Sequence, residues 1–176
     1  METGGVNRSR VMKNFESGDQ LLRDAEIYYE ELHSMYEKER WNIVIRRAQE
    51  VVELSLKGVL KMMGIEYPKV HNIAPLFVKL FQEKGIKLEK DMVEKLLMTS
   101  EILAKERAPS FYGEKVYSKE DADNAKKGAK DILEWINKIK NDIKCSKKDE
   151  NEKSETPPQT TEVIENGPED SKTDEK

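Results

Sequence analysis

The chain has 176 residues, 36% of them hydrophobic, and a formal net charge of −4, so it is long enough for one domain with a real core and short for two. Its single cysteine, Cys145, excludes an internal disulfide and favours a cytoplasmic location. No apolar run approaches the roughly 18 residues that a membrane span needs. From Ser146 onward there are ten acidic residues and five lysines, and we predict that 144–176 is a disordered acidic tail.

Two long segments carry apolar side chains at every third or fourth position, the pattern of amphipathic helices. The first helix is expected over about 16–38, after a flexible N-terminal arm at 1–14. The second is expected over about 41–63, where Gly64 suits a left-handed C-terminal cap.

Three further helices are expected in the second half of the chain. A short one begins after Asn72, a good N-cap, and stops at Gly85. The next runs over about 89–106, because Pro109 limits its extension. The last opens at Ser118, whose side chain can cap the first turn. The helix over 89–106 has six apolar positions: Met92, Val93, Leu96, Leu97, Ile102 and Leu103.

These elements define the predicted architecture. No segment shows a convincing strand pattern, and no internal repeat is visible. Residues 15–143 are therefore predicted to form an all-α, up-and-down four-helix bundle with one short extra helix.

The second helix also carries a polar row beside its apolar face. Gln49, Glu53 and Lys57 are four residues apart and share one side of the helix. Lys57 can bind a nucleotide phosphate while Gln49 reads a base or ribose, but no Gly-rich phosphate loop supports this. The alternative, which we favour, is a polar contact that fixes the register between helices or subunits. His71 can join this row, bind a phosphate, or make a hydrogen bond at the start of the third helix, which is the favoured use.

The order of these segments resembles a HEPN domain, the helical domain named for its occurrence in higher eukaryotes and prokaryotes and for nucleotide binding. The resemblance covers roughly 15–143, and it rests on a tyrosine-bearing first helix and on residues 48–58, 64–73, 107–109 and 117–122. It implies a bundle that commonly dimerises. It also implies a frequent nucleotidyltransferase-like partner, in toxin–antitoxin or related stress and defence systems.

Many proteins of this family are metal-independent ribonucleases with an Arg followed, four to six residues later, by a His. In that chemistry the His moves protons during attack of a ribose 2′-hydroxyl, and the Arg stabilises the phosphate. Arg107 matches the Arg, but no His follows it, since His33 and His71 are the only histidines. A divergent ribonuclease has to combine Arg107 with Tyr112 or Glu114, and a tyrosine with a pKa of roughly 10 is a poor general base at neutral pH.

The resemblance also points to a modification site, because in some systems the nucleotidyltransferase attaches nucleotides to a tyrosine near the Arg. Tyr112 and Tyr117 are the positions nearest that role, and Tyr112 is favoured by proximity. The plainer alternative is that both rings pack the loop against the bundle.

Basic residues raise the question of nucleic-acid binding. Arg40, Arg46 and Arg47 begin the second helix, and Trp41 beside them can stack on a base. A second basic cluster lies on the last helix: Lys126, Lys127 and Lys130. Since the part of the chain before the tail is nearly neutral, a solvated surface is the favoured interpretation. Sequence-specific DNA binding has no positive indication, and two histidines do not make a metal site.

Two functional hypotheses follow. The first is a non-catalytic dimeric module that binds a nucleotide, RNA or a nucleotidyltransferase partner, without a cofactor or metal. Its candidate nucleotide-binding residues are Gln49, Glu53, Lys57, His71 and Arg107. The second is the divergent ribonuclease described above.

Overall fold

A computed structural model describes residues 8–154 of the chain, with side chains described for 9–145. The described part contains α1 (Arg8–Glu37), α2 (Trp41–Met62), α3 (Ala74–Glu83), α4 (Lys90–Tyr112) and α5 (Lys119–Ser154). It has no strand, and the all-α prediction is confirmed.

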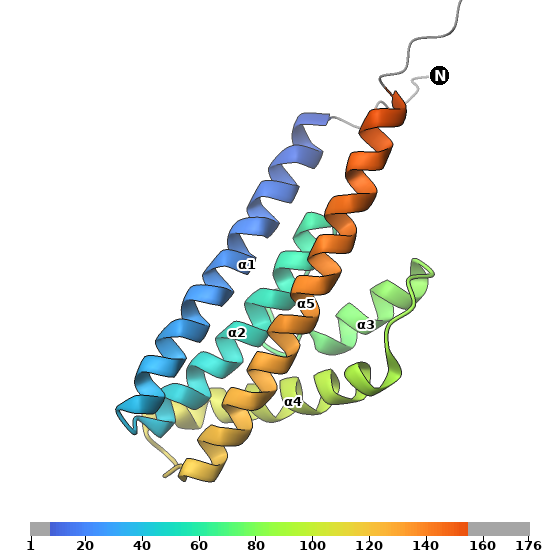
Figure 1. Cartoon of the computed structure of the whole chain (residues 1–176). Helices are drawn as coiled ribbons and strands as arrows, with labels where there is room; N and C mark the ends of the chain where they lie inside the picture. Colours follow the sequence, from blue (N-terminus) through green and yellow to red (C-terminus); the bar gives the residue numbers. More distant parts are fainter. Residues whose placement is uncertain (1–7, 155–176) are drawn as a thin grey trace, which may run out of the picture.

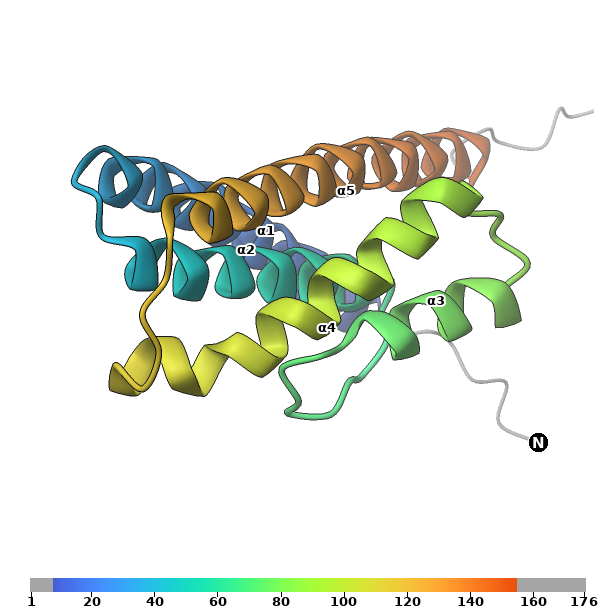
Figure 2. The same cartoon turned by 90° about the horizontal axis from the view of Figure 1, so that it is seen from below.

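Helix α2 is the central element of the fold. It packs against α1, α4 and α5, and α1 and α5 lie along it in the long direction of the molecule (Figure 1). α1 runs opposite to α2, and α5 runs in the same direction as α2. α4 crosses this group obliquely, with the short α3 beside it (Figure 2). The fourth long helix is therefore tilted across the bundle.

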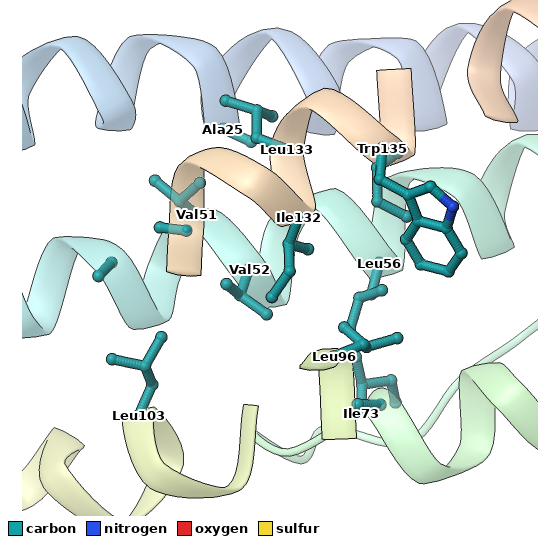
Figure 3. Close-up of a cluster of buried hydrophobic side chains, with 14 of the residues drawn as sticks. Ala25, Val51, Val52, Leu56, Ile73, Leu96, Leu103, Ile132, Leu133 and Trp135 are labelled. Carbon is teal, nitrogen blue, oxygen red and sulfur yellow. The ribbon is translucent and has the colours of Figure 1, made fainter. Parts of the chain in front are cut away.

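The core is built around α2 because this helix is apolar on several sides. Val51, Val52 and Leu56 are almost fully buried. α5 contributes Ile132 from one side, and α4 contributes Leu96 from the other (Figure 3). A helix that buries so much of its circumference must have neighbours on each side. The polar side of α2 is the part of this helix that is left to form a binding site.

The outermost helices are longer than predicted. α1 begins at Arg8, so 8–14 is helical where a flexible arm was expected, and α5 continues through 144–154, which we assigned to the disordered tail. Neither stretch contains a proline or glycine, and Ile143 still packs against the core. The remainder of the predicted arm and tail lies outside the described residues.

The predicted end of α4 is wrong, since the helix continues past Pro109 to Tyr112. A proline in a helix loses one backbone hydrogen bond and strains the preceding turn. Here the Ser110 hydroxyl donates to the Arg107 carbonyl at 2.9 Å, and Gly113 caps the helix in the left-handed region at φ 71°. As a result Phe111 and Tyr112 lie on a helix, where we expected a loop.

Two predicted caps have different outcomes. Asn72 does not cap α3, because its side-chain oxygen instead accepts a hydrogen bond from the Ser100 hydroxyl of α4 at 2.8 Å. Ser118 does cap α5: its hydroxyl accepts from the Asp121 amide at 3.1 Å, and its own amide donates to the Asp121 carboxylate at 2.8 Å. The hydrogen bond between Asn72 and Ser100 holds the loop before α3 against α4.

Asp19 links α1 to α5 through ion pairs with Lys140 and Lys144, each 3.1 Å from Oδ1. Burial raises the pKa of Asp19, but the two lysines more than offset this and hold it below its ordinary value. Since the folded pKa is depressed, the stabilisation is present above about pH 4 and is lost as pH falls through the folded pKa. We expect Asp19→Asn to lower the free energy of unfolding at pH 7 by about 1 kcal/mol.

Urea unfolding at pH 7 and at pH 3 measures this effect. The difference between the wild type and Asp19→Asn should shrink at the lower pH, because the wild-type carboxylate is then progressively protonated. Glu30→Gln, at an exposed position of α1, is the control. An equal difference at both pH values contradicts the assignment.

Candidate functional site

The polar row of α2 forms a hydrogen-bonded chain, as its spacing predicted. The Gln49 side-chain amide donates to Glu53 Oε2 at 2.6 Å, and Lys57 Nζ donates to Glu53 Oε1 at 2.5 Å. Gln49 is 2% exposed. The Glu53 and Lys57 side chains are 14% and 13% exposed. The row is therefore a largely buried ion pair with an amide at one end.

His71 completes this cluster from the loop before α3. Its Nδ1 lies 3.0 Å from Glu53 Oε2, and half of its side chain is exposed. The favoured prediction for His71, a hydrogen bond at the start of the third helix, is therefore replaced by the alternative in which it joins the α2 row. Tyr67 of the same loop places its ring 5.6 Å from Lys57 Nζ. These contacts attach the loop to α2.

The electrostatics of the cluster keep Glu53 ionised. Burial raises its pKa, but hydrogen bonds from Lys57, Gln49 and His71 more than offset this and hold the pKa below its ordinary value. Burial and the nearby Glu53 charge raise the pKa of Tyr67. A carboxylate with three donors and a lowered pKa is a weak proton acceptor. The cluster is suited to holding α2 and the loop in register.

A second group of polar side chains lies further along the interface between α2 and α4. The Arg46 guanidinium carbon lies 5.2 Å from the centre of the Phe111 ring, which joins the two helices. Gln49 is one turn beyond Arg46 on α2. Because the helices run in opposite directions (Figure 2), Arg107, one turn before Phe111, lies at the same level of the interface.

Three buried polar atoms in this group have no hydrogen-bond partner among the described residues: Arg46 Nε, Arg107 Nε and Gln49 Oε1. Neither arginine has a carboxylate within 4.0 Å in this part of the chain. By contrast, the neighbouring Arg47 is paired with Glu50 at 2.5 Å and with Glu31 at 2.9 Å. We call Arg46 and Arg107 the arginine pair. The Nε atoms are buried, but the terminal nitrogens of a half-buried guanidinium group that lacks a carboxylate are suited to an anion such as phosphate.

The two candidate tyrosines have very different environments. Tyr112 is 71% exposed and stacks edge-to-face on Phe111 with ring centres 5.0 Å apart. Tyr117 is 6% exposed, and its hydroxyl donates to Glu106 Oε2 at 2.7 Å. Burial and that hydrogen bond raise the pKa of Tyr117 well above its ordinary value. Only Tyr112 of the two is placed for contact with another molecule.

Sequence reasoning missed the pairing of Arg46 with Phe111. Arg46 was grouped with Arg40 and Arg47 as a solvated basic cluster, although helical spacing places it on the side of α2 that bears Gln49 and Glu53. This spacing was the available signal. In the described part of the chain, no group of three or more His, Cys, Asp or Glu side chains is arranged to hold a metal ion. Among the described helices, none is long and apolar enough to cross a membrane.

Together these features define an all-helical domain whose second and fourth helices enclose a polar seam that ends in two arginines. The family model of the HEPN domain matches residues 19–139. The chain belongs to the HEPN domain family.

One solved structure supports this fold assignment. It is the crystal structure of an archaeal HEPN homologue, with a TM-score of 0.54 and 22% sequence identity, covering 70% of this chain and 97% of that chain. At this identity the likeness shows the fold alone. A comparison with curated proteins found no match.

Proposed function

We propose that the protein is a non-catalytic, homodimeric HEPN module that binds RNA or a nucleotide through the arginine pair. The observation that carries the proposal is the arginine pair itself, in which two half-buried guanidinium groups lack carboxylate partners among the described residues. Arginine side chains of this kind commonly bind the phosphate groups of nucleic acids.

Aromatic rings beside the arginine pair support a nucleotide over a simple anion. Phe111 is 58% exposed and Tyr112 is 71% exposed, so both rings are open to a base. Stacking on exposed rings is the usual sequence-tolerant way to hold single-stranded nucleic acid. By contrast, Glu53, Lys57 and His71 of the cluster bind one another, and they hold α2 and the loop before α3 together. We therefore assign Arg46 and Arg107 to phosphate, and Glu53, Lys57 and His71 to support.

A non-catalytic role is supported by the histidines. No His follows Arg107 in the sequence, and His71 is hydrogen-bonded to the ionised Glu53. The exposed Tyr112 is the position at which a nucleotidyltransferase partner, as in a toxin–antitoxin pair, can attach a nucleotide. The single exposed Cys145 suits a cytoplasmic setting. Intact mass spectrometry of the protein from its native cell tests the modification, because Tyr112→Phe removes the added mass.

Fluorescence anisotropy with a labelled oligouridine RNA tests the binding site. We expect Arg46→Ala and Arg107→Ala each to weaken binding about tenfold, the loss of roughly one charge-assisted contact. Each should also reduce the slope of log affinity against log salt by about one. Arg47→Ala is the matched control, since the neighbouring Arg47 is already paired with Glu50 and Glu31.

The outcomes separate the hypotheses. An equal loss in Arg47→Ala, or no saturable RNA binding by the wild type, contradicts the proposal. The integrity of the RNA is followed in the same samples. If the wild type cleaves the RNA and Arg107→Ala does not, the protein is instead a ribonuclease that combines Arg107 with Tyr112 or Glu114.

A further inference from the structure

A groove separate from the arginine pair lies between α4 and α5. It encloses about 530 Å³, and its lining includes Ile45, Leu103 and Ala125. Met98 and Ile102 of α4 also line it, and they are 65% and 56% exposed. Ile102 belongs to the apolar pattern that predicted α4, yet it lies outside the core. Large apolar side chains that remain exposed beside a groove mark a surface that another molecule covers.

The groove has an acidic rim. Lys115 is paired with Glu106 at 2.7 Å, and Lys95 is paired with Asp131, so both lining lysines are neutralised. Asp91 has no ion-pair partner among the described residues, and Glu94 is paired only with the exposed Lys90 at 3.9 Å. Asp121 also has no ion-pair partner among the described residues, although it accepts hydrogen bonds from Ser118. Such a rim repels phosphate and attracts lysine and arginine.

The shape of the groove favours a helix over a small molecule. The lining residues of α4 recur at three- and four-residue steps from Asp91 to Glu106. At a helical rise of about 1.5 Å per residue this row is about 22 Å long, the length of a four-turn helix. α4 and α5 meet along this row, where Lys95 pairs with Asp131. A partner helix laid over this junction buries its apolar side on Met98 and Ile102, and methionine adapts to such packing.

We propose that this groove docks a basic amphipathic helix of a partner protein, with apolar side chains against Met98 and Ile102 and with lysine or arginine beside Asp91 and Glu94. The lining of the groove includes neither Arg46, Arg107 nor Phe111 of the proposed RNA site. Arg107 lies five residues after Ile102, about 140° around α4, and Phe111 lies on the opposite side of the helix from Ile102. One helix thus presents a basic, aromatic side and an acidic, apolar side.

Two labelled 16-residue helical peptides test the proposal on the full-length protein. Both carry leucine at every third or fourth position; one has lysine at the remaining positions and the other has glutamate. We expect saturable binding of the lysine peptide only. Ile102→Ser and Glu94→Lys should each weaken it about tenfold, the loss expected for one buried apolar contact or one favourable charge pair.

Two variants serve as controls. Ile27→Ser removes an apolar side chain of α1 that is 50% exposed and outside the groove, and it should leave peptide binding unchanged. Arg107→Ala should weaken RNA binding but not peptide binding, which makes the failure of either proposal distinguishable. If the lysine peptide binds the acidic tail and not the groove, Ile102→Ser will not change its affinity.

Several results overturn the proposal. Equal binding of the two peptides, no saturable binding of the lysine peptide, or full binding by Ile102→Ser each contradicts a basic helix in this groove. Binding of labelled oligouridine that is weakened by Ile102→Ser indicates an RNA surface instead. Sedimentation analysis completes the set: conversion of a wild-type dimer to monomer by Ile102→Ser means that a second copy of the chain covers the groove.

Discussion

Replacement of Gly18 by valine should destabilise the fold more than any other single change discussed above. Gly18 of α1 lies against Gly58 of α2, and a Cβ at Gly18 would be 2.5 Å from the Gly58 carbonyl oxygen and 2.6 Å from the Met62 amide nitrogen. Both atoms belong to the backbone of α2, so no side-chain rotation relieves the clash. The two helices must separate, and the expected cost is about 3 kcal/mol or more.

Thermal unfolding followed by circular dichroism measures this change. A loss of about 3 kcal/mol corresponds to a fall in Tm of about 10 °C for a domain of this size. Ser17→Val is the matched control, since it places the same side chain on the adjacent, exposed position of α1. A small effect at Gly18, equal to that at Ser17, is incompatible with the close helix contact.

Replacement of Glu53 by alanine should be the second most damaging change. It leaves Lys57, whose side chain is 13% exposed, without its carboxylate partner, and it removes the acceptor of Gln49 and His71. Removing one member of a largely buried ion pair strands the other charge away from water. We expect a loss of about 2–3 kcal/mol in the free energy of unfolding.

A double variant distinguishes a stranded charge from lost packing. Glu53→Leu with Lys57→Met replaces the ion pair by apolar side chains of similar size, and it should recover most of the stability lost in Glu53→Ala. Urea unfolding of both variants at pH 7 provides the comparison. If the double variant is as unstable as Glu53→Ala, the ion pair itself stabilises the fold and our explanation is wrong.

The sequence predicted the helices well because most of their signals are local. The apolar spacing of α2, the left-handed Gly64 and the Ser118 cap all depend on residues within one or two turns. The errors had two sources, a tertiary contact at Asn72 and a tolerated proline at Pro109. Asn72 has the chemistry of an N-cap, but Ser100, far away in the sequence, competes for its side chain. Pro109 has the chemistry of a helix stop, yet the following residues still complete a turn.

The candidate site was predictable only within α2. Gln49, Glu53 and Lys57 contact one another because they share a helix, and their spacing alone implies this. His71 and Arg107 come from other elements than α2. Helical periodicity does not predict how those elements pack against α2. Ile102 shows the same limit, because its apolar character is equally compatible with a core and with a groove that another molecule fills.

The close contact of Gly18 and Gly58 also bears on the order in which the chain folds. α1 and α2 are consecutive helices joined by only the short turn at 38–40, so their pairing requires little loop closure. α5 must instead join a partner far away in the sequence, across α3 and α4. Contacts between neighbouring segments form fastest. We therefore expect the α1–α2 hairpin to form first and α5 to pack on it later. The contacts between α2 and α4 should then form only after α4 has docked.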